Sequence, residues 1–258
     1  TFNSLRLGAI FRDVTEQKEK EKSLQELNAT KDRLFSIIGH DLKNPLNSIV
    51  GFTHLMNQNF NSYPDEKLKK FIGIINQSAS SLSALLDNLL LWSHAQRQKI
   101  IMEPTEVVFS HVTEKCFDIL RASADKKNLI LKNKLTDKHV GYADYQMMNT
   151  VMRNLLANAI KFTPKGGNIS VDGQIRSDKV IISIEDSGIG IEKEVAQKLF
   201  NPIMEYSSDG TDGEKGTGLG LIICKEFVEK NHGNIWVESE IGKGATFHIS
   251  LPALKTML

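Results

Sequence analysis

One histidine falls within a helical pattern, with a carboxylate and an amide close to it in the sequence. His40 is followed directly by Asp41, and Asn44 lies one helical turn further along. At about 100° per residue, with Ile49 at the centre of the apolar stripe, His40 falls on the opposite, exposed side. A neutral imidazole is a good nucleophile near pH 7, and a neighbouring carboxylate can accept its proton. A lone exposed histidine is more often an ordinary surface residue, so this group needs support from the rest of the chain.

Two asparagines and a lysine share one face of a second predicted helix, over residues 144–162. Asn154 and Asn158 are four residues apart, and Lys161 follows three residues later. Amide oxygens and an ammonium on one face make a seat for Mg²⁺-bound phosphates. Two asparagines on a helix are weak evidence when read alone.

Three glycine-rich motifs follow. DSGIG at residues 186–190 comes after a predicted strand, GTGLG at 216–220 opens a predicted helix, and GKG at 242–244 joins two predicted strands. Backbone amides at a glycine-rich helix start can bind an anion. The second motif is neither a Rossmann fingerprint, which follows the first strand of a βαβ unit, nor a Walker A loop, which ends in Gly-Lys-Ser/Thr. The polar stretch between Phe200 and Gly216 is predicted to be a functional loop that covers a nucleotide.

The composition is that of a globular protein, and the length suggests two compact units or one large one. The chain has 258 residues, of which 40% are hydrophobic and 24% charged, and its formal net charge is +1. This balance argues against binding nucleic acid through bulk charge, and we expect no direct nucleic-acid partner. Only two cysteines occur, Cys116 and Cys224, so no disulfide framework is expected. Neither a signal peptide nor a membrane-length apolar run is found, which predicts a cytoplasmic, soluble fragment. Whether the full-length protein is membrane-anchored stays open.

The first part of the chain is predicted to form a helical hairpin. An apolar stripe at helical spacing runs from Leu27 to Met56, and turn-forming residues at 57–65 interrupt it. A second stripe follows, with a heptad spacing from Leu68 to Leu89. A lone hairpin leaves half of its apolar stripe in water, whereas two hairpins paired in a four-helix bundle bury it. The pattern therefore predicts a homodimer through the helical hairpin.

The second part is predicted to be an α+β sandwich with helices on one face of a sheet. Helical patterns cover residues 114–124, 144–162 and 218–230. Alternating patterns predict strands at residues 128–133, 168–175, 179–185, 234–240 and 245–251.

The order of these features resembles the sensor histidine kinases of two-component systems. The exposed histidine is followed by NLLANAIKFT, DSGIGI, GTGLGL and GKGATF, and the resemblance covers residues from about 20 to 252. It implies a multidomain fold, in which an all-α helical hairpin (a four-helix bundle in the dimer) precedes an α/β (α+β) two-layer sandwich of the GHKL type, shared with gyrase-type and chaperone ATPases. The implied domains are a linker or the end of an upstream sensor domain at 1–26, a dimerisation and phosphotransfer domain at 27–99, and a catalytic ATP-binding domain at 104–254. Residues 1–17 resemble the end of a PAS sensor.

The resemblance also implies roles for the residues of the hairpin. His40 would accept the γ-phosphoryl group of ATP, with Asp41 as its acid/base partner. Asn44 would position water for dephosphorylating a partner protein. The function implied is a sensor histidine kinase that passes the phosphoryl group to an aspartate on the receiver domain of a response regulator, with phosphatase activity toward that regulator.

Further roles concern the nucleotide. Asn158, with Asn154 beside it, would hold Mg²⁺, and Lys161 would contact phosphate. Phe162 would flank the adenine, and Asp186 would accept a hydrogen bond from its amino group. The other implied ATP-binding positions lie in the glycine motifs and the last strand: Gly188, Gly190, Gly216, Thr217, Gly218, Leu219, Gly220 and Thr246.

Two other functions remain open at this point. A conformational ATPase of the gyrase or chaperone kind explains the asparagine and glycine motifs equally well, but gives His40 and the hairpin no role. A nucleotide-binding scaffold without turnover would bind ATP and show neither activity. Labelling with γ-labelled ATP separates them, since only the kinase acquires an acid-labile, base-stable label.

Overall fold

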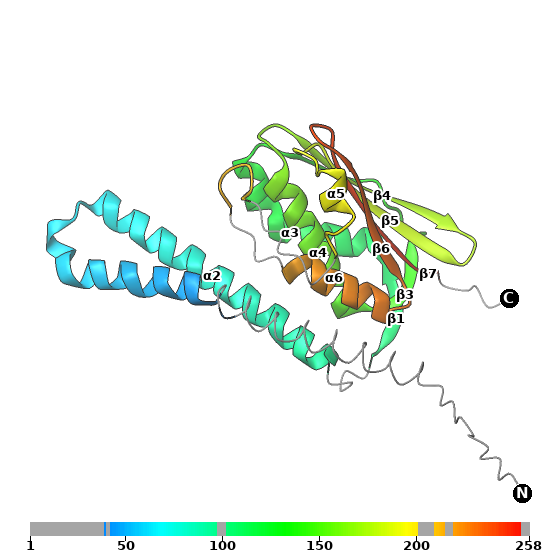
Figure 1. Ribbon diagram of the computed structural model, residues 1–258, viewed down its shortest axis with the longest axis horizontal. Coiled ribbons are helices and arrows are strands. Elements are labelled where there is room, and N and C mark those ends of the chain that lie inside the picture. The colour runs from blue at the N-terminus through cyan, green and yellow to red at the C-terminus, as the bar shows by residue number, and fades with distance from the viewer. Residues whose placement is uncertain (1–38, 40–41, 97–101, 201–208, 215–218, 254–258) are drawn as a thin grey trace, which may run out of the picture.

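The computed structural model describes residues 39, 42–96, 102–200, 209–214 and 219–253 (Figure 1). Residues 42–59 form a helix, η1 (Phe60–Ser62) makes a short turn, and α2 (Asp65–Gln96) runs back alongside it. Asp65 and Glu66 lie in the first turn of α2, where negative charge suits the helix dipole. The predicted interruption at residues 57–65 is thus confirmed, although the first helix continues to residue 59.

The hairpin packs around aromatic rings near its turn. The Phe71 ring, which is buried, lies 5.1 Å from the Phe52 ring and 5.4 Å from the Tyr63 ring, measured between centroids. Other large apolar side chains of the two helices remain exposed in the single chain: Leu46, Val50, Leu55, Ile72 and Leu86. A hairpin with so much apolar surface in water has an incomplete core.

A five-stranded sheet forms the second part of the molecule. Its strands are β2 (Ile130–Asn133), β4 (Asn168–Arg176), β5 (Lys179–Asp186), β6 (Asn234–Glu240) and β7 (Gly244–Pro252), in the order β2-β4-β5-β7-β6. Only the β2–β4 pair of this sheet is parallel. A smaller antiparallel pair joins β1 (Pro104–Val108) to β3 (Val140–Asp144).

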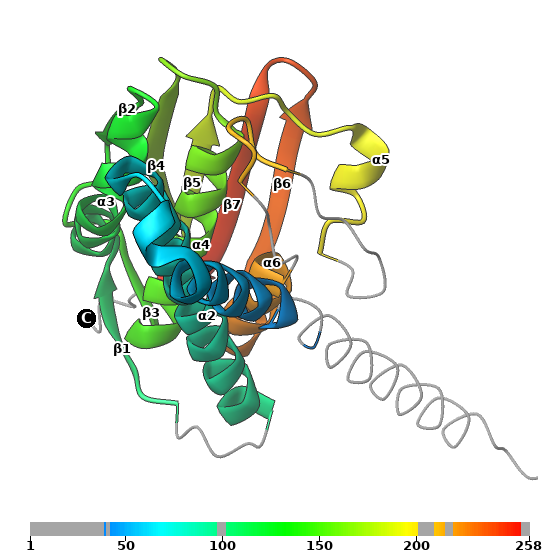
Figure 2. The ribbon, with the colours of Figure 1, turned by 90° about the vertical axis from the view of Figure 1, so that its left-hand side faces the viewer.

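Three helices cover one face of the sheet, as Figure 2 shows. They are α3 (Phe109–Lys126), α4 (Tyr145–Phe162) and α6 (Leu219–Lys230), while the short α5 (Lys193–Ala196) lies beside β6. The core between helices and sheet is closed by fully buried side chains, among them Phe109, Met152, Leu155, Ile182 and Phe227. Both cysteines are buried and unpaired. The predicted fold class, a helical hairpin followed by a two-layer sandwich, is confirmed.

The structure adds elements that the sequence patterns did not predict. The β1–β3 pair was missed because five residues are too few to establish an alternating pattern beside longer helices. The single-turn α5 was missed for the same reason. Among the helices that the structure describes, none is long and apolar enough to cross a membrane.

Candidate nucleotide site

Helix α4 presents a polar face to one side and a buried face to the core. Its start is fixed by Asp144, whose Oδ1 accepts a hydrogen bond from the Met147 amide at 3.0 Å. Apolar residues such as Leu155 and Leu156 are fully buried behind it. Asn154 and Asn158 are half-buried and, four residues apart, lie on the same face.

The side chain of Asn154 lies against the start of α6. A Cβ atom added at Gly220 would lie 3.7 Å from its amide carbon. Its Nδ2 is buried, and among the described residues it meets the Cys224 thiol, a weak acceptor, and no oxygen or nitrogen acceptor. A phosphate oxygen would be a stronger partner for this donor. Turning the amide over would present Oδ1 instead, which is the kind of ligand that Mg²⁺ accepts. The donor set therefore fits a magnesium–phosphate group.

Asp186 is a buried carboxyl at the end of β5, with a relative exposure of 5%. Its Oδ1 accepts hydrogen bonds from the backbone amides of Gly188 at 2.8 Å and Ala245 at 3.3 Å. Both protein hydrogen bonds to this carboxyl, within the residues described, are to Oδ1. Burial raises the pKa of Asp186 from its usual 3.8 to about 6, although the two backbone hydrogen bonds lower it. The carboxyl is thus held in place by one oxygen and can accept from a ligand with the other.

Two glycines allow the backbone to close around this carboxyl. A Cβ at Gly188 would lie 2.5 Å from Asp186 Oδ1 and 2.6 Å from the Phe162 carbonyl oxygen. Gly244 has φ = +89°, and its Cβ would collide with the Asp186 carbonyl oxygen. A side chain at either position would force the loops apart, so these glycines are required by close approach as well as by turn geometry.

The last turn of α4 connects the asparagine face to the neighbourhood of Asp186. The Phe162 carbonyl accepts a hydrogen bond from the Ile189 amide at 3.2 Å, which places the end of α4 beside the loop that follows Asp186. Lys161 Nζ lies 4.6 Å from the centre of the Phe162 ring. Burial lowers the pKa of Lys161, while Asp209 and Glu214 act to raise it. Aromatic ring, cation, amides and buried carboxyl therefore lie along one continuous edge of the sandwich.

The chain matches two protein-family models in the order of its two parts. The "His Kinase A (phospho-acceptor) domain" matches residues 30–98, and the "Histidine kinase-, DNA gyrase B-, and HSP90-like ATPase" matches residues 143–255. This chain belongs to the histidine kinases. Its ATPase-family domain is an ATP-binding domain.

Relatives and solved structures agree with this assignment. Sporulation kinase E of Bacillus subtilis is 33% identical over 248 residues, which is 95% of this chain and 32% of that protein. The non-motile and phage-resistance protein of Caulobacter vibrioides is 31% identical over 251 residues, or 95% of this chain and 30% of that protein. The histidine kinase ThkA, solved in complex with the response regulator TrrA, is 25% identical with a TM-score of 0.69, and the match covers 96% of this chain and 70% of that one. The chain spans half or less of the length of the first-ranked relatives.

The structure does not bring every predicted ATP-binding residue of this kinase to the site. Ala245 pairs with Asp186 across the β5–β7 ladder, whereas Thr246 pairs with the exposed Glu185. Because side chains alternate between the two faces of a strand, Thr246 lies on the face opposite to Asp186. The position beside the carboxyl belongs to Ala245, which contributes its backbone amide. We therefore remove Thr246 from the predicted set.

Gly190, predicted to lie at the nucleotide, is also required for the packing of two loops of the protein. Its φ is +73°, and a Cβ there would collide with the carbonyl oxygen of Glu240 at the end of β6. The Gly242 amide donates to the Ile189 carbonyl at 2.8 Å, which ties the same two loops together. Gly190 thus lets the loop after Asp186 pack on the β6–β7 turn.

Several predicted residues of the kinase lie outside the described part of the chain: His40, Asp41, Gly216, Thr217 and Gly218. Asn44 is described and lies exposed on the first helix of the hairpin, where its carbonyl accepts a hydrogen bond from the Ser48 hydroxyl at 3.2 Å. The roles proposed for these residues stay predictions.

A groove of about 930 Å³ lies elsewhere, between α5 and the edge strand β6. It contains neither Asp186 nor the two asparagines. Its charged lining residues are Glu192, Lys193, Glu238 and Glu240. Three carboxylates against one ammonium would repel a triphosphate, so we do not place the nucleotide there.

Proposed function

We propose that this chain is the kinase core of a sensor histidine kinase, which phosphorylates itself on His40 with ATP and passes the phosphoryl group to an aspartate of a response regulator. Dephosphorylation of that regulator is part of the same proposal, with Asn44 positioning the water. The observation that carries the proposal is the Asp186 carboxyl, which is buried and held by backbone amides on one oxygen alone. An adenine amino group is a donor that the other oxygen can accept from, which favours adenine over guanine.

In the phosphorylation step, a ring nitrogen of His40 attacks the γ-phosphorus of ATP. The bond between that phosphorus and the bridging oxygen breaks, and ADP leaves with the electron pair. Asp41 takes the proton from the other ring nitrogen, so that the imidazole ring stays neutral. In the second step a carboxylate oxygen of the receiver attacks the phosphorus, and the nitrogen–phosphorus bond breaks. The chain itself mainly positions the groups, since phosphoryl transfer needs alignment and charge neutralisation.

Mg²⁺ belongs to this proposal, with Asn158 and Asn154 as the residues that hold it. When bound, it neutralises charge on the phosphates. Lys161, at the end of the same helix face, adds a positive charge for the phosphates, and Phe162 flanks the adenine. Gly188 gives the base access to Asp186, and the Gly216–Gly220 motif, including Thr217 and Leu219, surrounds the phosphates.

The proposed function also implies partners for this chain. We infer a homodimer through the hairpin, because its exposed apolar residues need a second surface and the phosphoacceptor family to which it belongs dimerises. The phosphotransfer domain spans residues 27–99 and the ATP-binding domain residues 104–254, with a sensor domain upstream of residue 27. The expected location of this part is the cytoplasm.

The test is incubation with γ-³²P-ATP and Mg²⁺. We expect an acid-labile, base-stable label that is lost in His40→Gln. Asn44→Ala is the matched variant, since it should keep the label and lose dephosphorylation of the regulator. Release of phosphate without label would identify a conformational ATPase instead, and ATP binding with neither activity would identify a scaffold.

A further inference from the structure

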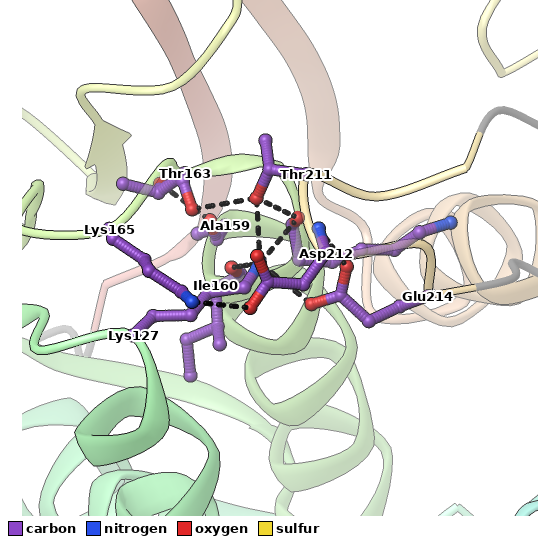
Figure 3. Close-up of polar contacts among 9 residues, drawn as sticks. Lys127, Ala159, Ile160, Thr163, Lys165, Thr211, Asp212 and Glu214 are labelled. Carbon is purple, nitrogen blue, oxygen red and sulfur yellow. Dashed lines mark hydrogen bonds and ion pairs between the residues drawn. The ribbon is translucent and has the colours of Figure 1, made fainter.

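A buried lysine outside the proposed catalytic set closes the C-terminal end of α4. Lys127 follows α3 directly, and its side chain is only 4% exposed. Its Nζ lies within hydrogen-bonding distance of four oxygens: Ile160 O at 2.9 Å, Lys161 O at 2.9 Å, Thr211 Oγ1 at 2.8 Å and Glu214 Oε1 at 2.6 Å. Two of these belong to α4 and two belong to the segment 209–214. Figure 3 shows this segment meeting the end of α4 at Lys127.

The same contacts satisfy the carbonyls that a helix leaves open at its end. The last four carbonyls of a helix have no partner within it. Here Ala159 O accepts from the Thr163 amide, Phe162 O accepts from the Ile189 amide, and Lys127 supplies Ile160 and Lys161. A positive charge at this end also suits the helix dipole. The ammonium therefore stabilises the turn of α4 that carries Lys161 and Phe162.

The segment 209–214 is fastened to this turn by its own hydrogen bonds. The Thr211 amide donates to Lys161 O at 3.0 Å, and its hydroxyl lies 3.0 Å from Thr163 O. Glu214 accepts from the Asp212 amide through Oε2 at 2.9 Å and meets Lys127 through Oε1. Burial raises the pKa of Glu214, but the hydrogen bond from Lys127 and the backbone amides lower it further, so its pKa lies below the usual value. The Glu214 carboxylate is thus ionised at neutral pH.

We propose that Lys127, Thr211 and Glu214 form a latch that positions the phosphate-binding side of the site. The latch holds the Lys161 backbone on one side. On the other side, Glu214 is two residues from Gly216, where the glycine-rich motif begins. Asp186 and Gly188, at the adenine side, make no contact with the latch residues in the hydrogen bonds described. Lys127 and Glu214 are positioning residues, and this inference rests on the proposed nucleotide site.

Because the latch lies at the phosphate side and not at the adenine side, its loss can be distinguished from a general loosening of the domain by comparing ligands with and without phosphates. A loosened domain would bind adenosine and ADP more weakly to the same degree. Removing the Glu214 carboxylate alone leaves Lys127 on the α4 carbonyls beside Phe162. It should therefore weaken binding of ADP, which has phosphates, and change binding of adenosine little. Glu214→Gln is the variant of choice, because Lys127 keeps its two carbonyl acceptors and Thr211, and the fold is retained.

The matched control is an exposed ion pair between the same segment, 209–214, and the loop after α4. Lys165 Nζ lies 4.0 Å from Asp212 Oδ2, with side-chain exposures of 66% and 40% (Figure 3). Asp212→Asn removes this pair and keeps the backbone amide that Glu214 uses.

The experiment measures dissociation constants for ADP and adenosine by calorimetry, and exchange of the Thr211 amide by NMR in protein without nucleotide. For Glu214→Gln we expect ADP to bind about tenfold more weakly, adenosine to change by less than about twofold, and the amide to exchange about tenfold faster. Asp212→Asn should match wild type in all three. Equal weakening of both ligands, no weakening of ADP, or an equal effect of Asp212→Asn would each overturn the latch. A wild-type protein that binds ADP but never labels His40 would refute the kinase proposal and leave the latch standing.

Discussion

Lys127 and Asp186 are both buried charged residues of the sandwich, but their hydrogen-bond partners differ. Lys127 meets four oxygens of its own chain, including a carboxylate. Among the residues that the structure describes, no cation pairs with Asp186; two backbone amides hold it, and burial raises its pKa to about 6. We call Lys127 compensated, because its own chain supplies an opposite charge and hydrogen-bond acceptors; removing such a partner from a buried charge is costly. A buried charge that is left partly uncompensated costs stability and is ready for a ligand.

The largest expected effect comes from removing the charge of Asp186. In Asp186→Asn the amide oxygen can still accept from Gly188 and Ala245, but an NH₂ group replaces the oxygen that faces the ligand. We expect ADP to bind roughly 100-fold more weakly. Because the folded protein holds the Asp186 proton more tightly than the unfolded chain, ionisation costs stability above pH 6 and costs nothing below about pH 4. The rise of the pKa from 3.8 to about 6 corresponds to ~3 kcal/mol at pH 7.5. Because the new NH₂ group is a buried donor without a partner, which costs ~1 kcal/mol, the free energy of unfolding at pH 7.5 should rise by about 2 kcal/mol.

Urea unfolding at pH 7.5 and pH 4, together with ADP titration, measures both effects. Glu106→Gln is the control, since Glu106 is an exposed carboxylate on β1 and is not among the groups that shift the pKa of Asp186, and it should change neither quantity. A stability gain of equal size at both pH values would show that ionisation of Asp186 is not its cause.

Removing the compensated charge should act in the opposite direction. Lys127→Met keeps the apolar stem, but takes the donors from Ile160 O and Lys161 O and leaves Glu214 without its cation. Breaking a buried pair costs about 3–5 kcal/mol, and because Glu214 is 35% exposed and can turn to water, we expect a loss of about 2–3 kcal/mol. Urea unfolding measures it. The double variant Lys127→Met/Glu214→Met should recover part of the loss. If Lys127→Met were as stable as wild type, Lys127 would not contribute to the stability of the fold.

The pH dependence of ligand binding tests the same contrast at intermediate size. A protonated Asp186 no longer offers an anionic acceptor, and its pKa of about 6 places this change between pH 7 and pH 5. Adenosine should therefore bind about tenfold more weakly at pH 5 than at pH 7. Adenosine is the right ligand, because it has no phosphate that titrates in this range. His248→Gln should keep the dependence, since His248 lies on the outer face of the sheet beside Ser183; binding that is equally tight at both pH values would contradict the role of Asp186.

Asp186 was easier to identify from the sequence than Lys127. Asp186 was singled out through the family resemblance, whose DSGIGI motif could be placed at the end of a strand with clear alternation. The long patterns of α4 and of the β4–β5 pair were equally readable. Thr246 was misplaced by one residue, which in a strand exchanges the two faces, and the register with Asp186 becomes visible only when β5 and β7 pair.

Lys127 could not be predicted, because a pair of lysines at the end of a helix is typical of a solvated surface. Its burial depends on Thr211, which is 84 residues further along the chain, and on Glu214. No local pattern predicts that these residues meet. Short elements such as β1 escaped for a related reason, since their pairing with β3 is also set by tertiary contacts.

The smallest expected effect comes from the exposed ion pair Lys165–Asp212. This pair has the same chemical groups as Lys127–Glu214 but differs from it in burial. Both ion pairs reach the segment 209–214, Lys127–Glu214 from the end of α3 and Lys165–Asp212 from the loop after α4, but the second pair lies in water. Exposed pairs at such distances contribute about 0–1 kcal/mol and are screened by salt. Lys165→Met should therefore change the free energy of unfolding by less than about 0.5 kcal/mol, and that small difference should vanish in about 0.5 M salt. The loss in Lys127→Met should persist in the same salt. If salt reduced both losses alike, burial would not be what distinguishes the two pairs, and the contrast between compensated and uncompensated charges would have to rest on Asp186 alone.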